Sequence, residues 1–221
     1  MNEPTTIARV IVGSQLHGLA MPDSDTDLRR VWVTDVAEML SPWPPDAPEM
    51  APEEDGWELR HFVGLLVKGN PTVLEVLASD LALGPVDPRW EELRRLTPAT
   101  LDPSALHRAH TGYIVSQRRL IDDARRRGDE RRAAKAAVAA LRIADQGADL
   151  LRSGVLPTTV TRHRDLLMAI RTDGLIAELE DTWQRELDLA VAELDVAASD
   201  PHPDLAVDRP AVIAFLRSAY C

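Results

Sequence analysis

The fold is decided by one stretch, Gly13-Ser14-Gln15-Leu16-His17-Gly18-Leu19-Ala20-Met21-Pro22-Asp23-Ser24-Asp25-Thr26-Asp27. The apolar run Ile7–Val12 comes directly before it, and Leu28–Val33 follows directly after it. Both runs predict buried strands. A short helix is expected between them, from about Ser14 to Ala20. The stretch therefore predicts a strand, a tight turn, a short helix and a second strand.

The chemistry in this stretch comes from two pairs of residues. Glycine lets the backbone approach a phosphate closely, and Ser14 adds a hydroxyl where helix amides bind anions. Asp25 and Asp27 point to the same face if they begin the second strand. Two neighbouring carboxylates repel each other unless a cation lies between them or one is protonated. Oxygen ligands of this kind suit Mg²⁺ or Mn²⁺.

A polar turn without metal would explain Asp25 and Asp27 taken alone, and a helix cap would explain Gly13-Ser14 taken alone. The joint arrangement favours chemistry on a nucleoside triphosphate, in which two metal ions activate an attacking hydroxyl and neutralise the leaving pyrophosphate.

Bulk composition excludes several other classes of protein. The chain has 221 residues with 45% hydrophobic content, enough to bury a core, and a net charge of −11 argues against a generally basic nucleic-acid-binding surface. Cys221 is the single cysteine, so no internal disulfide forms. No secretory signal or apolar run of membrane-spanning length is present. We expect a cytoplasmic protein that does not contact membranes.

The two halves of the chain differ in texture. Residues 1–85 mix short strand-like runs with Gly and Pro, whereas residues 104–221 are rich in Ala, Arg, Leu and Asp with helical periodicity. We expect an α+β fold: a small mixed sheet flanked by helices over residues 1–100, followed by a helical bundle over residues 101–221. The Pro-rich segment Ser41–Pro48 is expected to be an exposed loop.

Individual elements can be placed from caps and apolar spacing. In the first half, Trp57–Leu59 is expected to end a third strand, with helices from His61 to Gly69-Asn70 and from Pro71 onward. In the second half we expect the following helices: Ser104–Arg127 capped by Ser104, a helix capped by Asp129 and ended by Gly154, then His163–Arg171, Leu175–Ala198 and Arg209–Ala219.

Gly13-Ser14 followed by Asp25-x-Asp27 resembles the signature of the polymerase-β-type nucleotidyltransferase superfamily. The full motif from Gly13 to Asp27 most resembles that of a bacterial and phage subfamily of predicted nucleotidyltransferases. Further similarity lies at Glu58-Leu59-Arg60-His61-Phe62 and in the segment from Leu66 to Glu75. The resemblance is strong over residues 7–80, weaker over 108–171, and fades afterwards.

The resemblance implies three carboxylates, two metal ions, and transfer of a nucleoside monophosphate to a hydroxyl. The first two carboxylates correspond to Asp25 and Asp27. The third is expected on a neighbouring strand between apolar residues, and Glu58 fits that pattern. Asp55 is the alternative if the strand ends earlier. A solvent-facing Glu58 at a helix start is the structural alternative, since the helix dipole favours an acid there.

Four further residues are candidates for binding the nucleotide. His17 either reaches a phosphate or base, or caps the short helix. Lys68 either complements a helix C-terminus or contacts the triphosphate, as basic residues past the third carboxylate do in this superfamily. Lys135 and Arg142 share one helix face within a basic stretch. That stretch is either a solvated face paired with nearby acids, or a cationic wall for the triphosphate or an RNA end.

We therefore expect a metal-dependent nucleotidyltransferase of the EC 2.7.7 type, binding ATP or another NTP and releasing pyrophosphate. The acceptor hydroxyl is expected on an RNA 3′ end or a partner protein. Two alternatives retain the same fold: a non-catalytic nucleotide-binding module, and an antitoxin-type protein that modifies its partner. The convergence of Asp25, Asp27 and Glu58 discriminates between the catalytic and non-catalytic hypotheses.

Overall fold

The computed structural model describes residues 4–42 and 47–221, and its sheet has three strands. Strand β2 (Asp27–Val33) lies between β1 (Thr5–Val12) and β3 (Glu54–Glu58). β1 pairs antiparallel with β2, and β2 pairs parallel with β3, so the sheet is mixed. The central strand is therefore the one that begins at the second aspartate of the motif.

Alternation along the strands gives the sheet a helix-covered face and an open face. On the covered face, Trp57 of β3 meets Phe62 edge to face, with ring centroids 6.0 Å apart. On the face without helices, Arg9 and Arg30 each donate to the carboxylate of Glu54 at 2.7 Å, and their side chains shield that carboxylate from solvent. Burial alone raises the pKa of Glu54, but the hydrogen bonds from Arg30, Ala51 and Arg9 outweigh it and hold that pKa below its ordinary value.

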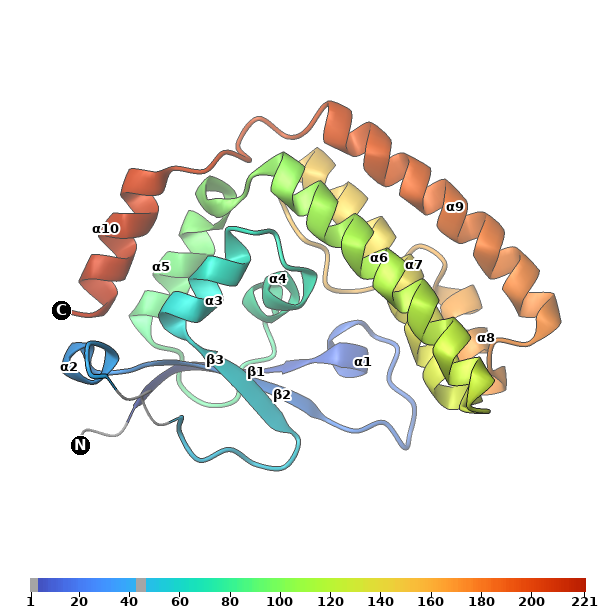
Figure 1. The fold of residues 1–221 in the computed structure, drawn as a ribbon, viewed down its shortest axis with the longest axis horizontal. Helices are drawn as coiled ribbons and strands as arrows, with labels where there is room; N and C mark the ends of the chain where they lie inside the picture. The colour runs from blue at the N-terminus through green and yellow to red at the C-terminus, as the bar shows by residue number, and fades with distance from the viewer. Residues whose placement is uncertain (1–3, 43–46) are drawn as a thin grey trace.

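Short helices of the first half cover the sheet, and capping side chains start most of them. Glu58, Asn70 and Asp87 accept hydrogen bonds from the first amides of the helices that follow them. The elements are α1 (Gly13–Leu16), α2 (Val36–Met39), α3 (Leu59–Leu66), α4 (Pro71–Ala78), α5 (Pro88–Leu96) and a 3₁₀ turn (Thr97–Thr100). Figure 1 shows α3, α4 and α5 together above the sheet.

Long helices make up the second half: α6 (Pro103–Arg126), α7 (Glu130–Ser153), α8 (Arg164–Asp173), α9 (Ala177–Ser199) and α10 (Arg209–Ala219). Helix α7 packs against both α6 and α9. Its alanine-rich sequence allows close approach on several sides, and Trp183 of α9 donates its indole N–H to the carbonyl of Ala137 at 2.9 Å. Helix α10 returns to contact α5 and the 3₁₀ turn, so the end of the chain lies beside its first half (Figure 1).

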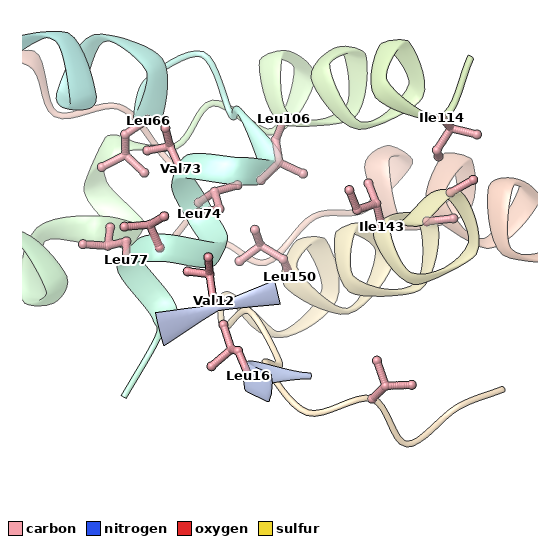
Figure 2. Packing of buried hydrophobic residues seen from close by; sticks show 14 of the residues in the cluster. Val12, Leu16, Leu66, Val73, Leu74, Leu77, Leu106, Ile114, Ile143 and Leu150 are labelled. Atoms are coloured by element: carbon pink, nitrogen blue, oxygen red, sulfur yellow. The ribbon is translucent and has the colours of Figure 1, made fainter. Parts of the chain in front are cut away.

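The buried apolar residues of both halves form one contiguous cluster. Val12 and Leu16, on either side of Gly13 and Ser14, belong to it together with Leu74 of α4 and Leu150 of α7 (Figure 2). The turn between β1 and α1 therefore rests on a packed base. None of the described helices is long and apolar enough to cross a membrane.

The expected α+β class is confirmed, and most expected elements are present. The first helix ends at Leu16 because Gly18 adopts φ +67°, and the helix expected from Ser104 is capped instead by Asp102, whose carboxylate accepts from Ala105 N. Helices α2 and α5 were not expected. Residues 43–46 of the Pro-rich segment lie outside the described residues. The division into domains at residue 100 stays a prediction.

A buried histidine between α6 and α7 makes stability depend on pH. His110 is 1% exposed and donates through Nδ1 to the carbonyl of Leu106 at 2.9 Å. Burial, together with the nearby charges of His107 and Arg142, outweighs that hydrogen bond and lowers the pKa of His110 from 6.5 to about 4. Because the unfolded chain then binds more protons between these two values, stability falls as pH decreases through this window.

We expect the free energy of unfolding to fall by about 2 kcal/mol between pH 7 and pH 5 through this residue alone. Urea denaturation of the wild type and of His110→Leu at both pH values measures it. Subtracting the two pH dependences cancels the other titrating groups, which both chains share. Equal pH dependence in the two proteins would show that His110 does not carry the effect.

Candidate active site

One cavity of about 260 Å³ brings the motif together with the helical half. Its walls come from the β1–α1 turn, the loop that leads into β2, helix α7 and helix α8. The lining residues are Gly13, Ser14, His17, Leu19, Ser24, Asp25, Asp27, Arg131, Lys135, Val138, Ala139, Arg142 and Arg171. Of the nine predicted site residues, seven line this cavity.

The turn at Gly13 accommodates only glycine, for two reasons. Its φ of +69° lies in the left-handed region, which L side chains rarely adopt. A Cβ atom at this position would collide with the carboxylate of Asp27. Gly13 therefore lets the backbone turn lie directly against the second acidic residue, and Ser14 follows it into the cavity.

The acidic pair has no partner of its own in the described protein. Asp27 begins β2 opposite Val12, while Asp25 lies in the loop two residues earlier, and both are exposed. No hydrogen bond or ion pair from another described residue reaches either carboxylate, although both line the same cavity as several cations. Two unneutralised carboxylates in one cavity are a donor set that suits a divalent cation.

A buried acid stands behind the turn. Glu75 of α4, with a side chain 12% exposed, accepts the N–H of Gly13 at 2.8 Å, and the same oxygen lies 3.0 Å from His17 Nε2. Its other oxygen lies 3.3 Å from Arg142 Nη1. Burial alone raises the pKa of Glu75, but the charge of Arg142 and the hydrogen bonds from His17 and Gly13 lower it to about 2. Glu75 is thus a carboxylate at neutral pH.

His17 and Arg142 each join this network to the helical half. His17 is 2% exposed and donates through Nδ1 to the carbonyl of Thr158 at 2.6 Å. Arg142 Nη1 donates to Gln146 at 2.8 Å, and Gln146 in turn donates to the carbonyl of Pro157 at 2.7 Å. These contacts hold the Gly13 turn, α4, α7 and the loop after α7 in one arrangement.

Helices α7 and α8 supply the cations of the cavity. Arg131, Lys135 and Arg142 follow one another along α7 at helical spacing and line the cavity together. Arg171 of α8 donates to Ser24 Oγ at 3.2 Å, next to Asp25. Within residues 4–42 and 47–221, no carboxylate pairs with Arg131, Lys135 or Arg171. They remain available to an anionic ligand.

The structure does not bring Glu58 or Lys68 to this cavity. Both line a separate one, and Glu58 instead caps α3 through Arg60 N and His61 N and accepts from Tyr220 Oη. The reason is register, since Glu58 pairs with Trp32 of β2. That position lies five residues, or about 16 Å of strand, from Asp27, and on the opposite face of the sheet.

Asp55, the alternative third carboxylate, occupies a different position. It pairs with Arg29, which lies two residues after Asp27, so Asp27, Arg29 and Asp55 share one face of the sheet. Asp55 is exposed and accepts a hydrogen bond from Gly56 N at 2.7 Å. Of the two acidic candidates on β3, Asp55 is therefore nearer to the acidic pair.

Metal binding at this site requires ligand oxygens beyond the protein. In the described parts of the chain, no three His, Cys, Asp or Glu side chains gather closely enough to hold a metal ion. Asp25 and Asp27 alone offer two carboxylates beside the Gly13-Ser14 turn. That donor set fits an ion whose remaining ligands come from a nucleotide and water.

Three residues of the site were not predicted from the sequence. Arg131 and Arg171 line the cavity, and Glu75 contacts the lining residues Gly13 and Arg142 from behind. Glu75 follows Asn70-Pro71 within a helix that reads as core, so its burial could not be read from spacing. Arg131 belongs to the basic stretch, which gave a signal without singling it out. Arg171 had no signal, because only the tertiary fold carries α8 to the loop at Ser24.

The mixed sheet, the glycine turn after its first strand and the acidic pair at its second define a polymerase-β-type nucleotidyltransferase. A model of the RNA repair pathway DNA polymerase beta family, RlaP, matches residues 2–195, and the chain belongs to this family.

The crystal structure of a nucleotidyltransferase-like protein from Exiguobacterium sibiricum 255-15 is similar to this chain at 13% identity and a TM-score of 0.32, covering 97% of this chain and 75% of that one. The search of curated proteins gives no match.

Proposed function

We propose that this protein transfers a nucleoside monophosphate from an NTP to an acceptor hydroxyl and releases pyrophosphate. One observation carries the proposal: a single cavity joins the Gly13-Ser14 turn, the cations Lys135 and Arg142, and the carboxylates of Asp25 and Asp27, which have no ion-pair partner among the described residues. The acceptor oxygen bonds to the α-phosphorus, the bond from that phosphorus to the bridging oxygen of the β-phosphate breaks, and the hydroxyl proton passes to water.

In this proposal the residues of the cavity orient and neutralise the triphosphate. The Gly13 turn and the Ser14 hydroxyl hold the β- and γ-phosphates. Lys135 and Arg142 of α7 neutralise the negative charge of these phosphates. Asp25 and Asp27 would hold divalent Mg²⁺ or Mn²⁺, and the bound metal would neutralise the leaving pyrophosphate and activate the hydroxyl. Asp55 is the better-placed third carboxylate. Positioning and electrostatics carry most of the rate enhancement in such a site.

We propose an RNA end as the acceptor. The family description names RNA repair, and the corner between α6 and α7 offers cations for a phosphate backbone. Arg127, Arg131, Arg132 and Lys135 have no ion-pair partner among the described residues. The net charge of −11 argues against a long nucleic acid, so a short terminal segment at this corner fits better.

The proposal is tested by transfer of label from each α-³²P-labelled NTP, with Mg²⁺ or Mn²⁺, to total RNA and to lysate protein. We expect label on RNA, lost when periodate has destroyed the terminal ribose diol. Label on protein would identify a protein acceptor instead and favour the antitoxin-type alternative. Label on neither, with any of the four nucleotides, would contradict nucleotidyl transfer.

A second candidate function is a non-catalytic nucleotide-binding module. The separation of Glu58 from Asp25 and Asp27 favours it, because the predicted third carboxylate does not converge with the pair. Thermal unfolding with each NTP separates the two functions. A ligand that binds only the folded state raises the melting temperature in both cases, and only the enzyme also releases pyrophosphate.

A further inference from the structure

The carboxylate of Glu75 lies between the Gly13 turn and Arg142 of α7. It contacts three nitrogens: Gly13 N at 2.8 Å and His17 Nε2 at 3.0 Å, which lie at the two ends of α1, and Arg142 Nη1 of α7 at 3.3 Å. A buried charge is costly unless it is paired and hydrogen-bonded, and Glu75 satisfies that condition through these contacts. Each contact fixes a group that lines the cavity.

The first consequence concerns the amide of Gly13. Because this N–H donates to Glu75, it is not free to donate to a phosphate. The contribution of Gly13 is therefore its shape, which lets the turn lie directly against the carboxylate of Asp27. Glu75 holds that shape from behind, on the side away from the ligand.

The second consequence concerns the guanidinium of Arg142. Its Nη1 is shared between Glu75 and Gln146, and the side chain is only 10% exposed. Among the described residues, Nε and Nη2 have no acceptor. One edge of the guanidinium is thus anchored in protein, and the other donors remain for an anion in the cavity that Arg142 lines.

We propose that Glu75 is a positioning residue: it orients the Gly13 turn and Arg142 so that both address the phosphates of the same triphosphate. This inference rests on the proposed function and adds to it a residue that does not itself touch the substrate. Simple electrostatics predicts the opposite effect, because removing a negative charge beside an anion site strengthens anion binding. The direction of change on substitution therefore discriminates positioning from charge alone.

The test compares Glu75→Gln, Glu75→Asp and Arg142→Met with the wild type. Binding of each NTP, and of tripolyphosphate as a minimal probe, is measured by calorimetry, so that the readout does not depend on turnover. Positioning predicts roughly tenfold weaker binding for both Glu75 variants, because glutamine places an amide against Arg142 or His17 and aspartate is one methylene too short. Charge alone predicts tighter binding for glutamine and unchanged binding for aspartate.

A double-mutant cycle then asks whether Glu75 acts through Arg142. If it does, Glu75→Gln costs little more binding once Arg142→Met is present. In turnover, lost positioning raises the KM for NTP about tenfold at similar kcat, whereas a loss of folded protein lowers the apparent kcat at unchanged KM.

The outcomes separate the two proposals. Wild-type protein that binds neither NTP nor tripolyphosphate would overturn the proposed function, and this inference with it. Wild-type binding that both Glu75 variants retain or improve would overturn the positioning role and leave the proposed function standing. If Glu75→Gln does not fold, the same decision rests on Glu75→Asp, which keeps the buried charge.

Discussion

Changing Asp25 and Asp27 together to asparagine is expected to reduce NTP-dependent product formation at least 100-fold without loss of folded protein. Both carboxylates are exposed, and within the described chain neither makes an ion pair that the substitution would break. Their mutual repulsion is also removed, which favours folding. Asparagine retains the shape and removes the charge that a divalent cation needs. Initial rates at saturating NTP and urea denaturation measure the two effects.

The same loop provides a matched control. Asp23 is exposed and lies two residues before Asp25, but it does not line the cavity. Asp23→Asn removes one negative charge from the loop, as each of the other two substitutions does. It is expected to leave the rate within a factor of two of the wild type. Turnover retained by the double variant would exclude Asp25 and Asp27 from the chemistry, and an equal loss in Asp23→Asn would point to loop charge in general.

Local patterns were sufficient to predict the first part of the site. The apolar run Ile7–Val12, the glycine turn and the two aspartates are contiguous, so their geometry follows from strand and turn rules. The structure places Gly13 and both aspartates along one cavity, and their role in binding a nucleotide stays a prediction. Lys135 and Arg142 were also predictable, because spacing of seven places them on one face of a long helix.

The third carboxylate depends on non-local information. Whether Glu58 or Asp55 lies near Asp27 is decided by the register between β2 and β3, and a shift by one residue reverses the face of every side chain. The parallel crossover between these strands includes the Pro-rich segment of residues 41–48, and the number of residues in it does not reveal the register. The pairing of Arg29 with Asp55 places Asp55 on the face of Asp27.

Tertiary packing also hides the supporting residues. Glu75 lies on α4 among buried apolar residues, so its helix reads as core. Its role depends on Gly13 from β1–α1 and on Arg142, which is 67 residues away in the chain. Helix α5 was missed because Pro88–Leu96 is mostly charged and buries only Trp90 and Leu93. In both cases the position of the residue or helix depends on the elements packed against it, and sequence periodicity does not reveal which elements those are.

Gly13→Ala is expected to lower both stability and turnover, because two separate costs fall on one residue. An L side chain at φ +69° costs about 1 to 2 kcal/mol in backbone strain. The added Cβ also collides with the carboxylate of Asp27, which must move. Displacing a catalytic group by about 1 Å costs about 100-fold in rate. Urea denaturation and initial rates of NTP consumption measure the two costs separately.

Gly84→Ala separates strain from collision. Gly84 has φ +87°, lies outside the cavity, and a Cβ there meets no atom within 4 Å. This variant is expected to lose similar stability to backbone strain and to keep its rate per folded molecule. If Gly13→Ala loses only as much activity as Gly84→Ala, the close approach of the turn to Asp27 has no catalytic role. A rate loss confined to Gly13→Ala shows that the turn sets the position of the acidic pair, because strain alone is present in both variants.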